Sequence, residues 1–479
     1  MLQEFIVAIE LGSSKMTGIA GKKNLDGSLS VLAVVKEDST SSIRKGVVYN
    51  MDKTVQGLQS IVKKLENVLK TKITKVYVGV GGQSIRSVRN VIVKDMQGAT
   101  IVTQAMINEL MDGNRSMSYP EQEILDAITQ EYKVDQQYQL DPVGIECTRL
   151  EGNFLNILWR KAFYRNINKC FATANLPIAE MHLAPLALAD SVLTEAEKRA
   201  GSVLVDLGAD TTTVSVYYKN ILRHLAVIPL GSNNITKDIA SLQMEEHEAE
   251  AMKLKYGSAF TDNNDIDSTL MLPIDAERSV ESRKFVEIVE GRVEEIVENI
   301  WFQVPNEYVD KLLGGIVLTG GGSNMKNIER AFRNHTRVEK IRVAKTIIPT
   351  VTAQHGELNN PDGTMNTVLG LLAKGELNCA GEEIRTDLFA PDDQKPTVVV
   401  NEPSRQQTSG RGIVQTEAEK QKAEEEAARR REEEEARQRE EAEEEARHQE
   451  ELRRQNAPGK KFMRSLRKFI DTIVNGDDE

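Results

Sequence analysis

Three glycine-rich turns, each placed directly after a short apolar run, constrain the fold of this chain more than any other feature. They read Glu-Leu-Gly-Ser-Ser-Lys-Met-Thr-Gly over 10–18, Val-Asp-Leu-Gly-Ala-Asp-Thr-Thr-Thr over 205–213, and Ile-Val-Leu-Thr-Gly-Gly-Gly-Ser-Asn over 316–324. Glycine lets backbone N–H groups approach a phosphate closely, and neighbouring hydroxyl groups add further donors. One such turn is typical of any strand end, whereas the three together favour a phosphate-binding cleft.

Two of these turns follow a strand that ends in an acidic residue, Glu10 in the first and Asp206 in the second. Carboxylate oxygens suit Mg²⁺, which keeps several of its waters while it bridges to phosphates. The third turn leads into a helix, whose first N–H groups suit a phosphate or a ribose. None of the three is a P-loop, since GxxxxGK[ST] is absent, and no GxGxxG opens a βαβ unit. The two acids predict a hydrated Mg²⁺ beside phosphates, with no cluster of direct protein ligands.

Short apolar runs alternate with amphipathic segments over most of the first 375 residues, which predicts an α/β layer architecture. Between about 83 and 165 the pattern of apolar and polar residues changes, which predicts a small α+β insertion. We expect strands at 5–9, 29–35, 75–80, 91–94, 99–103, 202–206, 212–218 and 315–318, helices at 54–69, 105–110, 121–130 and through Cys170, and a mostly helical block over 236–308.

The charge and cysteine content exclude several classes of protein. The chain has 479 residues, with 61 Lys and Arg against 73 Asp and Glu, so its formal net charge is −12. This acidic balance argues against a nucleic-acid-binding protein, whose footprint is a basic face. Cys147, Cys170 and Cys379 are too widely spaced for a disulfide framework or a CxxC site, and no HExxH motif occurs. No signal peptide and no apolar run of roughly 20 residues is seen, which predicts a reducing, cytosolic compartment.

The composition changes beyond about residue 388. Three prolines among Ser, Thr, Gln and Gly predict a disordered linker over 388–415. The following segment, 416–457, carries 16 acids and 10 bases between Thr416 and Gln455 and almost no large apolar residue. Repeated Glu–Arg pairs at i,i+4 predict a solvated helical spacer, and the missing apolar a/d positions exclude a coiled coil.

A short basic amphipathic helix is predicted at 458–479. Its apolar residues recur at helical spacing on one face, with bases opposite or at the flanks, which suits an anionic membrane surface. Docking on the globular part of the chain or on a partner is the alternative, and the long spacer disfavours docking on the chain itself. The apolar residues are Phe462, Met463, Leu466, Phe469, Ile470, Ile473 and Val474, and the bases are Lys460, Lys461, Arg464, Arg467 and Lys468.

These segments together resemble the FtsA family of bacterial division actins, within the actin/Hsp70/sugar-kinase superfamily. The turns have the superfamily order of phosphate-1, phosphate-2 and adenosine. AIELGSSKMTG, DPVGIECTRLEG, LADSVLTEAEKRAGSVLVDLGADTTTVSVY, IPLGSNNITKDIA, EAEAMKLKYG and IVLTGGGSNM look like FtsA segments in the expected order, over about residues 4–375. The resemblance implies an α/β, actin-like two-lobe ATPase fold with subdomains 1A, 1C, 2A and 2B, plus a flexible charged helical tail.

The implied subdomain boundaries follow the changes in the pattern of predicted strands and helices along the chain. Subdomain 1C is the insertion, in the place of actin's 1B. The boundaries are 1–82 and 166–200 for 1A, 83–165 for 1C, 201–240 for the first part of 2A, 241–310 for 2B, and 311–387 for the second part of 2A and the return to 1A.

The resemblance also implies which residues hold ATP and Mg²⁺. Glu10 and Asp206 would form the Mg²⁺-associated catalytic pair. Glu250 and Lys253 would reach the ribose or adenine from 2B, with an ordinary solvated helix pair as the alternative. The other nucleotide contacts would come from Gly12, Ser13, Ser14 and Lys15 in the first turn, Gly208, Ala209, Asp210 and Thr211 in the second, and Gly320, Gly321, Gly322, Ser323 and Met325 in the third.

Three positions depart from the superfamily pattern. Glu10 stands where many members carry Asp, and Ser232 follows a glycine where a second glycine is usual. Ala209 stands where glycine is common, so its Cβ crowds the phosphates. We therefore expect ATP binding with at most slow ATPase activity.

The implied function is that of an ATP-binding, self-associating cell-division protein, peripheral to the cytoplasmic face of the inner membrane at the septum. It would tether the FtsZ ring by binding the C-terminal peptide of FtsZ on 2B, where the helix around 283–301 lies. Later division proteins would be recruited through 1C. A pilus-assembly actin relative and a phosphotransferase of the same superfamily remain alternatives, whereas a chaperone would need a β-rich substrate domain that the charged tail does not contain.

Overall fold

A computed structural model describes residues 4–383 of the chain, except 263, 265, 267, 268, 354–357, 359 and 360. The predicted linker at 388–415, the spacer at 416–457 and the amphipathic helix at 458–479 lie outside the described residues. The same holds for every residue predicted to meet the membrane, from Lys460 to Val474.

The first of the two large sheets is built mainly from the N-terminal strands. Its spatial order is β12-β7-β1-β2-β3-β20. The first three strands form an antiparallel meander, while β7 and β20 run parallel to their neighbours at its two sides. Five of the six residues of β1 are buried, which explains why its sequence is an apolar run rather than an alternation. The strands are β1 (Ile6–Leu11), β2 (Lys15–Lys23), β3 (Leu29–Asp38), β7 (Val76–Val80), β12 (Ile178–Leu183) and β20 (Val351–Ala353).

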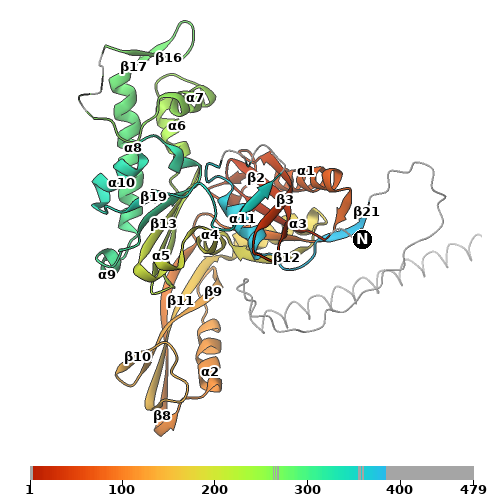
Figure 1. Cartoon of the computed structure of the whole chain (residues 1–479), viewed down its shortest axis with the longest axis vertical. Coiled ribbons are helices and arrows are strands. Elements are labelled where there is room, and N and C mark those ends of the chain that lie inside the picture. The colour runs from red at the N-terminus through yellow and green to blue at the C-terminus, as the bar shows by residue number, and fades with distance from the viewer. Residues whose placement is uncertain are drawn as a thin grey trace, which may run out of the picture. The chain divides into compact units, whose positions relative to one another are not determined.

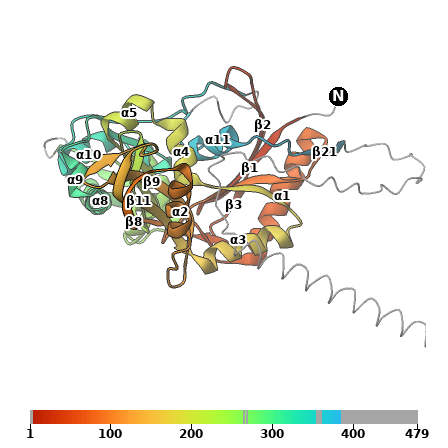
Figure 2. The same ribbon diagram turned by 90° about the horizontal axis from the view of Figure 1, so that it is seen from below.

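Helices cover both faces of this sheet. α1 (Met51–Leu69) and α3 (Lys161–Thr173) pack on one face, and α4 (Ala184–Val192) and α11 (Asn366–Lys374) lie on the other (Figure 2). α1 begins where the Asn50 side chain accepts a hydrogen bond from a first-turn N–H, so the cap defines the start of the helix.

The second sheet repeats the first. Its order is β10-β9-β11-β8-β15-β14-β13-β18-β19, so the run β19-β18-β13-β14-β15 has the same connectivity and directions as β12-β7-β1-β2-β3. A sheet with this topology, built twice in one chain, places two equivalent hairpin turns where the copies face each other. The strands are β13 (Ser202–Leu207), β14 (Thr212–Tyr218), β15 (Ile221–Ile228), β18 (Gly315–Thr319) and β19 (Ile341–Val343).

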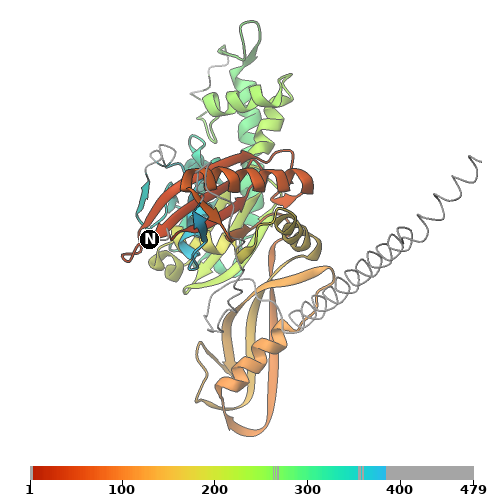
Figure 3. The same ribbon diagram turned by 90° about the vertical axis from the view of Figure 1, so that its right-hand side faces the viewer.

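The insertion supplies the other four strands of the second sheet, with α2 (Gln104–Arg115) packed along them (Figure 3). It joins the second sheet through β8, which meets β15 where Arg86 lies opposite Ala226. Its own small core contains Leu110, Leu150 and Phe154. The strands are β8 (Arg86–Ile101), β9 (Gln122–Val134), β10 (Gln137–Gln139) and β11 (Glu146–Arg160).

One prediction for the insertion is wrong, because the helix expected at 121–130 is the strand β9. The two short strands expected at 91–94 and 99–103 are confirmed as strand, but they belong to one continuous strand, β8, which ends at Ile101. In β9, register shifts against β11 leave Leu125 and Gln130 as bulges. Bulges interrupt the period-two alternation that marks a strand in a sequence.

The block over 236–308 is mostly helical, as predicted, but it also contains a short hairpin of β16 (Met271–Pro273) and β17 (Ser279–Glu281). Figure 1 shows this hairpin at the end of α8, beside α6 and α7. The helices of the second lobe are α6 (Ser232–Ala240), α7 (Glu246–Tyr256), α8 (Ser282–Phe302), α9 (Asn306–Val309) and α10 (Ile328–Thr336).

The remaining elements are small. They are β4 (Ile43–Arg44), β5 (Val47–Val48), β6 (Thr71–Ile73), α5 (Glu195–Ala200) and β21 (Ala380–Glu383). Among the helices of the described part of the chain, none is long and apolar enough to cross a membrane.

Candidate functional site

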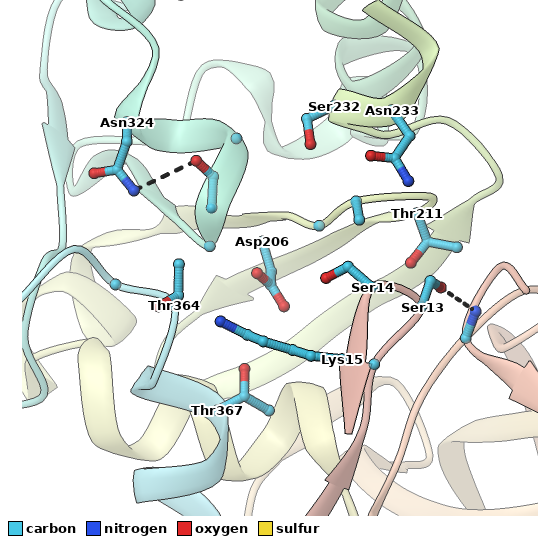
Figure 4. Close-up of a pocket in the computed structure, with 18 of the residues that line it drawn as sticks. Ser13, Ser14, Lys15, Asp206, Thr211, Ser232, Asn233, Asn324, Thr364 and Thr367 are labelled. Atoms are coloured by element: carbon cyan, nitrogen blue, oxygen red, sulfur yellow. Dashed lines mark hydrogen bonds between the residues drawn. The ribbon is translucent and has the colours of Figure 1, made fainter. Parts of the chain in front are cut away.

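A pocket of about 840 Å³ lies where the two repeated sheets face each other, and all three glycine-rich turns line it. Figure 4 shows polar side chains from both lobes pointing into this space. The first two turns are the β1–β2 and β13–β14 hairpins, and the third forms the 3₁₀ turn η2 (Gly321–Asn324) after β18. The pocket therefore has one wall from each copy of the sheet.

The two hairpin turns have the same geometry. The Gly12 N–H donates to the carbonyl of Lys15 at 3.1 Å, and the Gly208 N–H donates to the carbonyl of Thr211 at 2.9 Å. A Cβ at either glycine would lie 2.7 Å from the oxygen that accepts its hydrogen bond. Both turns therefore need glycine at this position, and both present their short loops to the pocket.

Glu10 and Asp206 are the two acidic residues that line the pocket from these hairpins. Burial, together with the charge of Asp206, raises the pKa of Glu10 to about 8, although Lys15 opposes this shift. Burial raises the pKa of Asp206 to about 6. Burial disfavours ionisation of both carboxyl groups, so a proton or a cation is stabilised beside them.

Lys15 is the basic residue of the first turn, and its side chain extends across the pocket to end between Asp206 and Thr364 (Figure 4). Burial works to raise the pKa of Asp362, but hydrogen bonds from Thr364 and the charge of Lys15 keep that pKa below its usual value. A cation from the first hairpin thus reaches Asp206 of the second lobe and Asp362 of the connection between β20 and α11.

The side chain of Lys253 is buried near the C-terminal end of α7, where it contacts α6. Its ammonium donates to the Thr236 hydroxyl at 2.9 Å and to the carbonyl of Ser232 at 3.2 Å, and it forms an ion pair with Glu250 at 2.7 Å. Both Glu250 and Lys253 line the pocket. The structure therefore places this pair at the site rather than on a solvated helix face.

The third turn closes the pocket near Asp206. Gly320 has φ 81°, and a Cβ there would lie 2.4 Å from a carboxylate oxygen of Asp206. Gly321, Gly322 and Met325 line the pocket. Ser323 does not line it, because its buried hydroxyl donates to the carbonyl of Gly320 at 2.7 Å and stabilises the turn itself.

All but two of the sequence-predicted pocket residues lie around this one space. The exceptions are Ser323 and Asp210, whose carboxylate accepts hydrogen bonds from the Lys45 N–H at 3.2 Å and from Asn233 at 2.8 Å. Residues that were not predicted to contact the nucleotide also line the pocket: Leu11, Thr17, Gly46, Gly79, Gly81, Gly82, Ala184, Pro185, Thr213, Ser232, Asn233, Leu254, Lys255, Gly257, Asn324, Lys326, Asp362, Gly363, Thr364 and Thr367. The Gly81–Gly82 pair at the end of a predicted strand is the one signal that could have indicated part of this set.

The residues present fit a magnesium nucleotide. Backbone loops at two equivalent hairpins suit phosphates, the paired carboxyls suit a hydrated cation, and η2 with α7 leaves room for a nucleoside. A separate group that could hold a metal, Glu294, Glu298 and His335, has its ligand atoms within 4.8 Å of one another. Two of these three side chains are exposed, and exposed acids often gather without an ion.

Comparison with known proteins identifies the family. The chain is 33% identical over 335 residues to the cell division protein FtsA of Neisseria meningitidis serogroup B, a match that covers 68% of this chain and 80% of that protein. The chain belongs to the FtsA family. The FtsA of Porphyromonas gingivalis is also 33% identical, over 68% of this chain and 69% of that protein. This FtsA family member is thus a cell-division protein.

Two family models match separate parts of this chain. The one described as "Cell division protein FtsA" matches residues 203–370, and the one described as "SHS2 domain inserted in FTSA" matches residues 82–158. A solved structure described as "PilM-PilN type IV pilus biogenesis complex" has a TM-score of 0.54 at 13% identity and covers 77% of this chain and 98% of that one. That likeness concerns the fold alone, and the fold is the actin-like α/β fold predicted from the sequence.

Proposed function

We propose that this chain binds ATP with Mg²⁺ in the pocket between its lobes and acts as a self-associating adaptor that tethers the FtsZ ring to the cytoplasmic membrane. One observation carries the nucleotide part: two hairpins of the same geometry, each with an acid at the same register position, line one pocket. Turns of this kind hold adjacent phosphates with backbone N–H groups.

The proposed roles follow from where each residue lies. Ser13, Ser14 and Lys15 would contact the phosphates from the first hairpin, and Ala209 with Thr211 from the second. Glu10 and Asp206 would hold the waters of Mg²⁺, whose chemistry is to neutralise phosphate charge. Glu250 and Lys253 would face the sugar, and η2 the adenosine. Turnover would be slow at most, because Ala209 lines the pocket and its Cβ would crowd phosphates bound at the second hairpin.

The subdomain assignment is part of the same proposal. We assign the six-stranded sheet to 1A, the insertion to 1C, the repeated part of the nine-stranded sheet to 2A, and the block around α7 and α8 to 2B. Downstream division proteins would meet 1C, and copies of the chain would meet one another in a filament.

The proposed membrane contact rests on the sequence of 458–479. One short amphipathic helix is a weak, reversible anchor. Many copies joined in a filament bind far more tightly through effective concentration. Nucleotide-dependent self-association would therefore strengthen attachment at the septum.

The proposed FtsZ contact lies in a groove between α6 and α8. The groove has a volume of about 320 Å³ and is lined by Asp238, Ser241, Glu287, Ile288, Gly291, Arg292 and Glu295. Arg292 is the base in this set, and it pairs with Asp238 at 2.5 Å and with Glu295. A carboxylate of the FtsZ C-terminal peptide would compete for this guanidinium.

The groove can be blocked without disturbing the helix, because a Cβ added at Gly291 meets nothing within 4 Å. We expect Gly291→Leu to weaken binding of a fluorescent FtsZ C-terminal peptide at least about tenfold, a loss of about 1.4 kcal/mol. Gly98→Leu is the matched control, since a Cβ at Gly98 also meets nothing within 4 Å and lies on β8. Equal affinities of the two variants would place the peptide elsewhere.

Liposome co-sedimentation tests the proposal as a whole. The full chain is spun with vesicles containing anionic lipid, with and without ATP–Mg²⁺, beside Phe469→Glu and the conservative control Phe469→Leu. We expect sedimentation that ATP–Mg²⁺ strengthens, that Phe469→Glu abolishes and that Phe469→Leu retains. Sedimentation of all three proteins alike would contradict the role of the C-terminal helix. If ATP–Mg²⁺ had no effect on sedimentation, the proposal that nucleotide binding strengthens membrane attachment would be wrong.

A further inference from the structure

The loop over 39–50, between β3 and α1, is fastened to the first hairpin turn. The Ser39 hydroxyl donates to the carbonyl of Gly12 at 2.6 Å. The Gly46 N–H donates to the hydroxyl of Ser13 at 2.8 Å. The loop therefore moves with the first lobe.

One hydrogen bond leads from the same loop to the second hairpin. The N–H of Lys45 donates to one carboxylate oxygen of Asp210 at 3.2 Å, and the other oxygen accepts from the amide of Asn233 at 2.8 Å. The successive N–H groups of Lys45 and Gly46 are thus bound by turns of opposite lobes. Asp210 is the residue through which the second turn holds this loop.

The tip of the loop has a backbone that fixes where these N–H groups point. Lys45 has φ 50° and Gly46 has φ 71°. Gly46 also packs on Gly82 so closely that a Cβ at Gly46 would lie 2.4 Å from the Gly82 Cα. The Lys45 N–H therefore cannot turn away without disturbing the packing beneath it.

Asp210 differs in position from its two neighbours. Ala209 and Thr211 line the pocket, whereas Asp210 does not. Both of its carboxylate oxygens accept hydrogen bonds from protein donors. Its side chain is therefore engaged at the rim of the pocket rather than directed at whatever the pocket holds.

We propose that Asp210 is a positioning residue that latches the two lobes together at the rim of the pocket and so delays the escape of a bound nucleotide. The inference rests on the proposed function, which supplies the nucleotide as the ligand. It goes beyond that function because it gives Asp210 a role other than contacting the phosphates. With the carboxylate removed, the second turn loses its hold on the loop at 39–50, and the cleft opens more often. Hydrogen bonds to a charged partner are among the stronger ones, so the change is measurable.

Release of a fluorescent ATP analogue, mant-ATP with Mg²⁺, from the full chain tests the latch by stopped flow. We expect Asp210→Ala to raise the dissociation rate about tenfold, corresponding to about 1.4 kcal/mol, with association within about twofold of the original rate. Asp210→Asn should fall between the two, because its amide oxygen still accepts the Lys45 N–H. Asp26→Ala is the control, since Asp26 accepts a backbone N–H from Ser28 at 2.9 Å in the β2–β3 turn.

Amide hydrogen exchange provides a second readout that needs no nucleotide. In Asp210→Ala the Lys45 amide should exchange faster, while the Gly46 amide, which is bound by Ser13, should not. Equal release from the original chain and Asp210→Ala would overturn the latch. Slower association without faster release would overturn it as well, since a latch acts on the escape of the bound nucleotide and therefore on the dissociation rate. Failure of the original chain to bind mant-ATP would instead overturn the proposed function.

Discussion

Glu10 and Asp206 occupy the same place in two copies of one β-hairpin. Glu10 lies opposite Thr17 across the first hairpin, and Asp206 lies opposite Thr213 across the second. Each acid comes two residues before the glycine that closes its turn, and both side chains line one pocket. The duplicated topology thus brings together two carboxyls that are almost 200 residues apart in sequence, and burial together with the charge of Asp206 raises the pKa of Glu10.

Glu10→Gln should change how stability depends on pH. The pKa of Glu10 is about 8 in the folded chain, against 4.5 for an ordinary Glu. A raised carboxyl pKa contributes stability that is complete below the unfolded-state value and is lost as the pH rises through the folded value. Allowing for solvent in the pocket, we expect Glu10→Gln to gain on the order of 2 kcal/mol over the original chain between about pH 5 and pH 8.

Urea unfolding of both proteins at several pH values, without nucleotide, measures this difference. Asp206→Asn is the comparison. Its stability relative to the original chain should stop increasing nearer pH 6, where the folded-state pKa of Asp206 lies. Parallel pH profiles for the original chain and Glu10→Gln would contradict the assigned burial of the carboxyl.

Gly320→Ala and Gly321→Ala should differ although they are neighbours. Gly320 has φ 81° and no room for a Cβ, whereas a Cβ at Gly321 meets only a Thr364 methyl group at 3.5 Å. A non-glycine residue in the left-handed region costs about 1–2 kcal/mol before any clash. We expect Gly320→Ala to lower the free energy of unfolding by at least that amount and Gly321→Ala to leave it almost unchanged. Similar urea midpoints for the two variants would refute the described turn.

Arg223→Ala should loosen the junction between the insertion and the second sheet. Its buried guanidinium donates to Gln130 at 3.3 Å and to Glu131 at 3.1 Å, so β15 is tied to β9. Breaking a buried pair costs about 3–5 kcal/mol, and the partial exposure of Glu131 reduces this to about 2 kcal/mol. Thermal unfolding measures the loss, and hydrogen exchange should rise first in β9. Arg149→Ala is the control, because Arg149 is exposed and pairs with Glu151 within the insertion; an equal loss in both variants would contradict the junction.

The sequence predicted the two lobes well because their signals are local. Apolar runs ending in Gly-Ser or Gly-Ala-Asp specify a buried strand followed by a tight turn, and such turns form wherever the chain can bury the strand. The insertion was predicted less well, since β9 carries bulges at Leu125 and Gln130 that hide its alternation. Pairing with β11 rather than local propensity determines that strand.

The pocket was predicted from its turns and missed elsewhere for the same reason. Gly46 and Asp362 line it from loops without a motif, and only the tertiary fold brings them there. Asp210 is a case in the other direction. The resemblance implies a nucleotide contact for it, whereas in the structure its carboxylate accepts hydrogen bonds from Lys45 and Asn233. Partners that a distant loop supplies leave no signal in the turn itself.

Equilibrium binding of ATP–Mg²⁺ to the full chain, measured by calorimetry, tests the central claim most directly. Gly321→Phe fills the pocket from a position where a Cβ is tolerated, and Gly98→Phe adds the same side chain to β8. We expect saturable binding to the original chain and to Gly98→Phe, and affinity at least about tenfold weaker, or about 1.4 kcal/mol, for Gly321→Phe. Absence of saturable binding to the original chain, or equal binding by both variants, would contradict a nucleotide site between the lobes.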